Sequence, residues 1–235
     1  MNNLFTNLNT DGMEQQKDVL GGYSPLETGA YLAKIKTAYV TMSKNNAMAV
    51  NLVCDIDGRE YREQLWITNS QGQNFYKNKS TGNKVPLPGF TVLNDICMCA
   101  VEKELRELDT EPRVFKIYDF DTKSEMPKEV PTITELLDSE IILGITKQVV
   151  DKTVKDASGN YVPSGETREE NVIEKVFHAQ THKTVNEARA NVEEASFYDK
   201  WVAKNAGHTK MKAKGAKAEG KAGMPTKPAT KSLFS

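Results

Sequence analysis

The sequence has little histidine and little cysteine, with three of each in 235 residues. So few histidines leave little material for acid–base catalysis. The odd number of cysteines, all inside apolar segments, indicates buried thiols in a reducing compartment rather than a disulfide framework. No apolar run approaches the roughly 18 residues of a membrane span, and Met1–Gln16 lacks the apolar stretch of a signal peptide. We therefore expect a protein of the cytoplasm, with Cys54, Cys97 and Cys99 in its core.

Sequence signatures of enzymes are also lacking. His178 and His182 have the spacing of a zinc-binding helix, but Ala179 stands where the general-base glutamate is required. No glycine-rich phosphate loop is present, and no serine or cysteine has a convincing base partner. We expect a protein that is not an enzyme and needs no cofactor or metal.

One enzymatic alternative stays open. Four acids cluster near a predicted hairpin and could hold the metal ions of a nuclease, although such acids are more often turn and edge residues. They are Asp55, Asp57, Glu60 and Glu63.

Charge is distributed unevenly along the chain. The formal net charge is −1, but from Ala203 onward eight lysines and one acid give +7, so the rest of the chain is acidic. The last segment is also rich in Ala, Gly and Pro, a composition that cannot bury enough surface to order itself. We therefore predict a flexible N-terminal segment over residues 1–22, one folded domain over 23–205 and a disordered basic tail over 206–235.

The first half of the domain predicts three antiparallel strands. Ala30–Met42 is rich in β-formers, and Ala47–Ile56 alternates apolar and polar residues. Asp57-Gly58 is a hairpin dipeptide that leads into Glu60–Thr68. A Gly-, Asn- and Lys-rich loop, Asn69–Pro88, then precedes a predicted amphipathic helix over Phe90–Leu108.

The second half predicts a strand pair and short helices. Region 112–131 carries prolines and has no clear pattern, and Thr132–Leu137 suits a short helix. Ile141–Val154 and Asn171–Ala179 are the expected strands, joined by a wide turn over Asp156–Glu170. Helices are expected at Thr184–Ala195 and Phe197–Lys204. This α+β order, three strands, a helix and two strands, is that of an OB-fold five-stranded barrel with C-terminal helices.

Contacts to a nucleic acid are expected where cations and aromatic rings occur together, because phosphates need cations and every base can stack on a ring. The segment Thr68–Phe90 holds Phe75, Tyr76 and three lysines with no acid. Trp66 lies on the polar face of its strand, so a base, a helix or a second subunit should cover it. In the first strand Tyr31, Ile35 and Tyr39 are expected on one face and Lys34 and Lys36 on the other, although imperfect alternation indicates a bulge. The predicted DNA-binding residues are Tyr31, Lys34, Lys36, Tyr39, Arg62, Trp66, Phe75, Tyr76, Lys77, Lys79 and Lys84.

Several short segments, in order, resemble the single-stranded DNA-binding proteins of tailed phages. They are Thr28-Gly29-Ala30-Tyr31-Leu32-Ala33-Lys34-Ile35, Met48–Val53, Leu65-Trp66-Ile67-Thr68, Pro88-Gly89-Phe90, Val176-Phe177-His178-Ala179-Gln180-Thr181, Glu187-Ala188 and Lys200-Trp201-Val202. The resemblance spans roughly residues 28–205. It implies an OB fold that coats single strands without sequence preference during phage replication, recombination and repair in the host cytoplasm.

The tail departs from that family. Many single-strand binders end in an acidic tail that recruits replication proteins, whereas this tail is basic and carries an apolar pair, Leu233 and Phe234. The tail could add nonspecific DNA contacts, could dock this pair on a partner such as a polymerase, or could have no specific role. The alternative to a DNA-coating protein is therefore an OB-fold adaptor that recruits a polymerase or another partner through the tail. The sequence leaves oligomeric state open, including a homo-oligomer.

Overall fold

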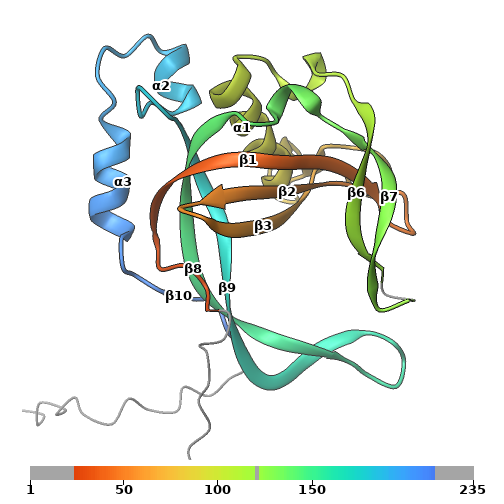
Figure 1. The fold of residues 1–235 in the computed structure, drawn as a ribbon. Helices are drawn as coiled ribbons and strands as arrows, with labels where there is room; N and C mark the ends of the chain where they lie inside the picture. The colour runs from red at the N-terminus through yellow and green to blue at the C-terminus, as the bar shows by residue number, and fades with distance from the viewer. Residues whose placement is uncertain (1–23, 120–121, 215–235) are drawn as a thin grey trace, which may run out of the picture.

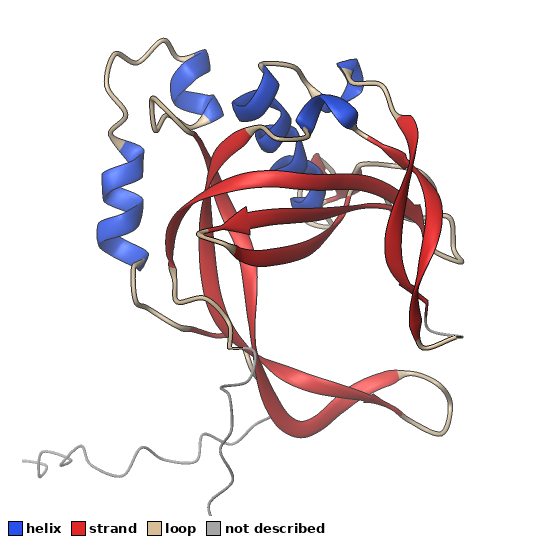
Figure 2. Ribbon diagram, viewed as in Figure 1, coloured by secondary structure: helices blue, strands red, loops and turns tan. Residues whose placement is uncertain are grey.

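The computed structural model describes residues 24–119 and 122–214 of the chain (Figure 1). Within these ranges strands predominate and the helices are few and short (Figure 2). The predicted class, mainly β with helices, is confirmed. The expected N-terminal segment 1–22, and Leu233 and Phe234 of the tail, lie outside the described residues. No helix in the described part of the chain is long and apolar enough to span a membrane.

Three antiparallel strands form the predicted meander: β1 (Gly29–Met42), β2 (Met48–Ile56) and β3 (Arg59–Trp66). Asp57 and Gly58 both have positive φ, 52° and 78°, as a tight hairpin turn between right-twisted strands requires. Alternate residues point into the core as expected; they are Val50, Leu52, Cys54 and Ile56 of β2 and Tyr61 and Leu65 of β3.

The suspected irregularity in β1 is a β-bulge. Ile35 lies opposite Cys54 and Thr37 lies opposite Val53, so Lys36 is the extra residue. An inserted residue reverses the inward and outward alternation beyond it. Ile35 and Ala38 are both fully buried, which puts Tyr39 on the outer side. The expectation that Tyr39 shares a face with Ile35 is therefore wrong.

The loop after β3 carries a small two-stranded sheet, β4 (Phe75–Lys77) with β5 (Lys84–Pro86). Helix α1 (Pro88–Val101) follows and buries Leu93, Ile96, Cys97 and Cys99, so all three cysteines of the chain are core residues as predicted. Burial raises the pKa of each thiol to about 12. The helix ends seven residues earlier than predicted, with Glu102 in the left-handed conformation. The Asn94 side chain accepts a hydrogen bond from the Leu105 amide, 3.0 Å, and so turns the chain back.

The region without a clear pattern folds as a hairpin between two short 3-10 helices, Leu105–Glu107 and Thr134–Leu136. Its strands are β6 (Glu111–Asp119) and β7 (Ser124–Thr132), paired from Glu111 opposite Thr132 to Asp119 opposite Ser124. β7 joins the main sheet through one pairing, Tyr39 with Thr132.

The last two long strands are β8 (Glu140–Lys155) and β9 (Tyr161–His178). The predicted wide turn is wrong, because β9 begins at Tyr161 and the turn is tight. Asp156 accepts side-chain hydrogen bonds from the amides of Ser158 and Asn160, at 2.9 and 2.8 Å, and Gly159 takes φ 82°. The distal half of the hairpin extends away from the rest of the fold (Figure 1).

Helix α2 (Val185–Arg189) is shorter than predicted, and α3 (Phe197–Asn205) lies close to its predicted range. Trp201 of α3 packs with Ile142 and Phe177 on the outside of the sheet. The chain then forms β10 (Lys210–Met211), which pairs in parallel with β8. The described part of the chain thus continues past residue 206, the predicted start of the tail, to Lys214.

The main sheet runs β10-β8-β1-β2-β3, with β7 and β6 added at β1 and β9 added at β8. Among the described strands β3 and β9 do not pair, so the sheet does not close. One side chain bridges the gap between them: Glu63 of β3 accepts a hydrogen bond from the Ile173 amide of β9, 2.9 Å. Asn171 of β9 instead bonds both backbone groups of Leu26, which precedes β1, at 2.7 and 2.8 Å.

Candidate nucleic-acid interface

The outer side of the β-meander carries three of the predicted residues, Tyr39, Arg62 and Trp66. Its strand pairings place Tyr39, Asn51 and Gln64 in one row, with Arg62 in the row before and Trp66 in the row after. We call this surface the β1–β3 face and define it by Tyr39, Thr41, Asn51, Arg62, Gln64 and Trp66. Tyr39 was expected on the other side of its strand, so the bulge is what brings it here.

Polar side chains form a ladder across the β1–β3 face. Gln64 Nε2 donates to Asn51 Oδ1 at 3.1 Å, and Asn51 Nδ2 donates to Thr41 Oγ1 at 2.8 Å. Amide groups of this kind can bond the edges of any base. The sequence reasoning missed Asn51 and Thr41 because it searched only for cations and rings.

Arg62 supplies the cation of the face. Its Nε lies 2.5 Å from Glu60 Oε1, and its side chain is 61% exposed. The hydrogen bond to Glu60 raises the pKa of Arg62 above its ordinary value, and the negative charges of Glu60 and Glu125 contribute. An exposed pair of this kind is weak, so a phosphate can compete with Glu60 for the guanidinium.

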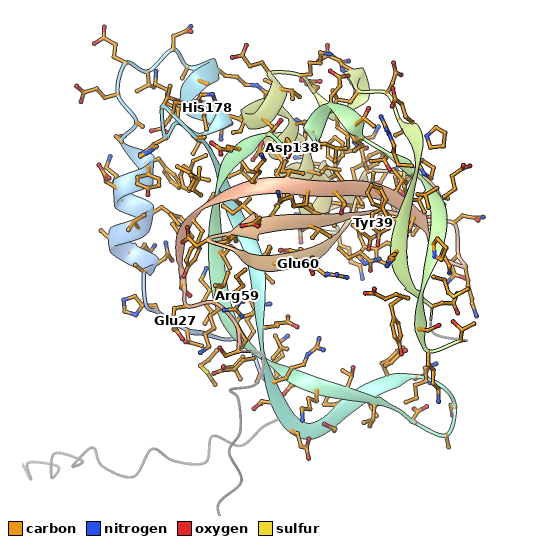
Figure 3. All side chains as sticks on the ribbon, viewed as in Figure 1. Glu27, Tyr39, Arg59, Glu60, Asp138 and His178 are labelled. Atoms are coloured by element: carbon orange, nitrogen blue, oxygen red, sulfur yellow. The ribbon has the colours of Figure 1, made fainter. Side chains whose placement is uncertain are left out.

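Tyr39 links the face to the β6–β7 hairpin. Its ring stacks on Phe115 of β6, with centroids 5.9 Å apart and planes 28° apart. Burial raises the pKa of Tyr39, while the nearby Arg62 lowers it. Figure 3 shows Tyr39 at the end of the meander that adjoins this hairpin.

Trp66 ends the face at the gap between β3 and β9. Its side chain is 42% exposed and lines a cavity of about 500 Å³ together with Leu87, Val92 and Ile173. Gly89 of α1 permits this arrangement, because a Cβ there would lie 2.4 Å from the Trp66 carbonyl oxygen. The described chain covers Trp66 only in part.

The β4–β5 hairpin carries the other predicted aromatic group. Lys84 Nζ lies 4.5 Å from the centre of the Phe75 ring, so this lysine occupies one face of the ring. Tyr76 is 49% exposed and lines a cavity of about 490 Å³ with Lys210 and Lys212. This cavity and the one beside Trp66 share the lining residues Pro88, Val92, Val172 and Ile173. Lys77 and Lys79 are exposed nearby in sequence.

Three predicted residues of β1 do not join the β1–β3 face. Tyr31 packs against the core, and its hydroxyl donates to the Glu27 carbonyl at 2.7 Å. Lys34 forms an ion pair with Asp138 at 3.1 Å, and Lys36 is exposed at the bulge.

The four acids considered as nuclease ligands do not converge. Asp55 Oδ1 accepts from the Gly58 amide at 2.8 Å, Asp57 lies in the turn, Glu60 pairs with Arg62, and Glu63 points inward. His178 ends β9 and His182 lies in the following turn with φ 57°, so the two histidines are not on a helix. Among the described residues no group of three or more His, Cys, Asp or Glu side chains could hold a metal ion.

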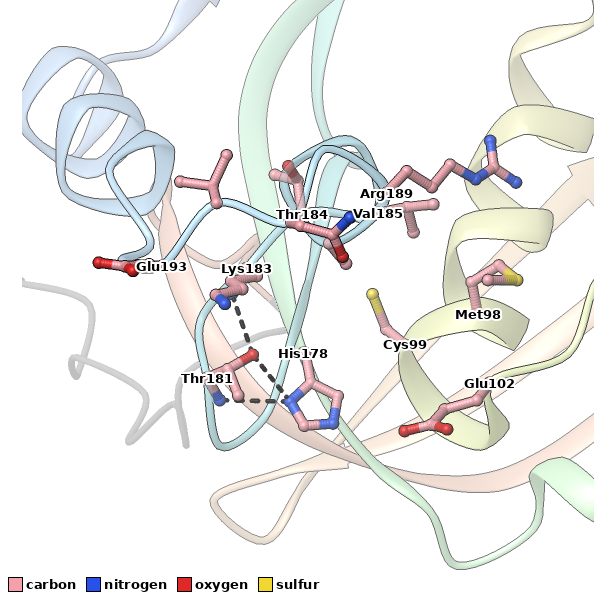
Figure 4. A pocket seen from close by; sticks show the side chains of 13 residues that line it. Met98, Cys99, Glu102, His178, Thr181, Lys183, Thr184, Val185, Arg189 and Glu193 are labelled. Carbon is pink, nitrogen blue, oxygen red and sulfur yellow. Dashed lines mark hydrogen bonds between the residues drawn. The ribbon is translucent and has the colours of Figure 1, made fainter.

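A separate cavity of about 730 Å³ lies between the C-terminal end of α1, the turn after β9 and α2 (Figure 4). Met98, Cys99 and Val185 form part of its apolar lining, and His178 Nδ1 accepts from the Thr181 amide at 3.2 Å. None of the sequence-predicted contacts lines this cavity.

A comparison with models of known protein families gives no match, and a comparison with curated proteins gives no match either.

Proposed function

We propose that this protein binds single-stranded DNA without sequence preference, along the β1–β3 face and over Trp66 toward the β4–β5 hairpin. The observation that carries the proposal is the gathering of Tyr39, Arg62 and Trp66 on one outer surface, with an amide ladder between them. Rings for base stacking beside a cation for phosphate are what sequence-independent binding requires.

The arrangement of elements supports an OB-type barrel as the scaffold. β1, β2, β3, β8 and β9 take the order of its five strands, and α1 lies between the third and fourth. The open edge falls between β3 and β9, where α1 packs and the Glu63 side chain bridges to Ile173. We infer that this side-chain bridge and the packing of α1 close the barrel here in place of a backbone ladder.

We further propose that the protein coats and protects single strands during phage DNA replication, recombination and repair in the host cytoplasm. The support for this is the sequence resemblance alone. The adaptor alternative differs in one respect, since it assigns the essential contacts to residues of the basic tail.

Binding of a fluorescently labelled oligonucleotide, single-stranded and then duplexed, tests the proposal. The β1–β3 face should prefer the single strand and keep much of this preference in added salt, because stacking is screened far less than charge. The Trp66→Ala variant should lose binding, whereas Trp66→Phe should keep most of it.

A further inference from the structure

The β6–β7 hairpin stands beside the β1–β3 face and is not one of the five strands assigned to the barrel. Two contacts bring it to the face: the Phe115 ring stacks on Tyr39, and Glu125 lies near enough to Arg62 to raise the pKa of the arginine. Tyr39 and Arg62 also influence one another's pKa. The hairpin and the face therefore approach one another at four side chains, two from each.

The backbone holds the hairpin only at its base. β7 pairs with β1 at Thr132, and the next amide, Ile133, donates to the Ala38 carbonyl at 2.9 Å. From Arg113 to Val130, the described residues of β6 and β7 pair only with each other. A two-stranded ribbon is marginal by itself, so side-chain contacts such as the Tyr39–Phe115 stack must fix its position.

The hairpin exposes apolar side chains toward solvent. Val114 is 63% exposed, Tyr118 47% and Met126 42%. Met126 pairs with Ile117 and therefore lies on the Phe115 side of the ribbon, whereas Val114 and Tyr118 lie on the opposite side, so a ligand between the hairpin and the face would cover Met126. The candidate ligands are another protein strand and a nucleic acid.

Prolines argue against a protein strand. Pro112, Pro127 and Pro131 lack the backbone N–H groups that a partner strand would need, and such prolines are a known means of blunting sheet edges. Binding through side chains remains, and a flat aromatic base suits the rings of Tyr39 and Phe115.

We propose that the β6–β7 hairpin forms a second wall of the strand-binding site and holds a single strand of nucleic acid between itself and the β1–β3 face. This inference rests on the proposed function. A strand held between two walls must break contacts with both before it leaves, so the hairpin acts mainly on the dissociation rate. Phe115 sets the distance between the two walls through its stack on Tyr39 and offers the other face of its ring to a base.

The hairpin can be removed at a defined point, because Arg113 and Val130 lie opposite one another. Replacing residues 114–129 by Asn-Gly leaves a two-residue turn between them. A second variant, Phe115→Leu, removes only the ring. Phe197→Leu on α3 is the matched control, since Phe197 is 37% exposed and packs near Phe177, apart from the face.

The experiment measures dissociation of a labelled oligothymidine long enough to cross the face, with thermal unfolding as the check on folding. We expect both hairpin variants to release the strand roughly 5- to 150-fold faster than wild type, the factor for one lost stacking contact. Phe115→Trp should restore slow release, and Phe197→Leu should match wild type.

Two results would overturn the inference. If wild type binds and both hairpin variants release the strand at its rate, the hairpin is no wall while the proposed function stands. If wild type binds no single strand, the proposed function and the inference fall together. If the truncated protein fails to fold, the dissociation rates of Phe115→Leu and Phe197→Leu decide the question by themselves.

Discussion

Glu63 of β3 joins β9 through a hydrogen bond that its Oε2 accepts from the Ile173 backbone amide, 2.9 Å. The same oxygen accepts a 2.5 Å hydrogen bond from the Tyr61 hydroxyl. Burial raises the pKa of Glu63 above its ordinary value of 4.5, and these two hydrogen bonds oppose the rise. A side chain that titrates therefore spans the open edge of the sheet.

The stability of the protein should depend on pH through Glu63. Since the folded-state pKa of Glu63 is raised, the folded protein holds this proton more tightly than the unfolded chain. The contribution to stability is full below about pH 4.5 and declines as pH rises toward the folded-state pKa. Glu63→Gln should lack this decline in urea unfolding, with Glu129→Gln as an exposed-acid control. If the unfolding free energies of Glu63→Gln and wild type change with pH in parallel, the pH dependence does not come from Glu63.

Removing the Glu63 side chain altogether should lower the unfolding free energy more than Glu63→Gln does. Glu63→Ala leaves the buried Ile173 amide without its acceptor, which typically costs about 1–3 kcal/mol of unfolding free energy. The comparison of Glu63→Ala with Glu63→Gln, which can still accept, measures the two hydrogen bonds that Oε2 accepts together, from the Ile173 amide and from the Tyr61 hydroxyl. Equal stabilities of the two variants would mean that water replaces the carboxylate.

Gly89 should tolerate no side chain. A Cβ would lie 2.4 Å from the Trp66 oxygen and 2.8 Å from the Trp66 nitrogen, and both are backbone atoms. Gly89→Ala should therefore shift the start of α1 and destabilise the fold by about 1–3 kcal/mol, as overpacking does. In Gly29→Ala the Cβ meets only the Tyr31 ring at 3.3 Å, so this control should be milder. A wild-type melting temperature for Gly89→Ala would contradict this packing.

All three thiols should be unreactive in the folded protein. Burial raises the pKa of Cys54, Cys97 and Cys99 to about 12, so almost no thiolate is present at pH 8. A thiol reagent should label none of them until denaturant is added, and then all three. Fast labelling of any thiol under native conditions would show that the core opens around it.

Truncation after Lys214 separates the two functional hypotheses. β10 lies before this point, so the cut preserves the Lys210–Glu174 ion pair at 2.6 Å. A DNA-coating domain should keep its preference for single strands. A plot of the logarithm of the binding constant against the logarithm of the salt concentration should become less steep. Its slope should fall in magnitude by about 0.7 for each lost lysine that had contacted a phosphate. Loss of the single-strand preference itself would favour the adaptor.

Local patterns in the sequence predicted much of the fold. Period-two alternation located β2 and β3, and apolar positions at helical spacing located α1. Side-chain contacts set the remaining boundaries. The Asn94 hydrogen bond to Leu105 helps end α1 early, and the Asp156 side chain converts a predicted wide turn into a tight one.

The candidate site was less accessible to sequence reasoning. The bulge at Lys36 was suspected, but its effect on the side of Tyr39 depends on the exact register between strands. The β6–β7 hairpin gave no clear pattern because its prolines and exposed apolar residues obscure the alternation. Its contact through Phe115 joins residues far apart in sequence, which no local pattern encodes.

The central claim is that the β1–β3 face binds single strands by stacking as well as by charge. Fluorescence anisotropy of the full-length protein with one labelled oligonucleotide, single-stranded and duplexed, at low and moderate salt tests it most directly. We predict tighter binding of the single strand and a preference that largely survives added salt. Equal binding of both forms, fading together as salt rises, would contradict the claim and leave only the charge of the basic tail.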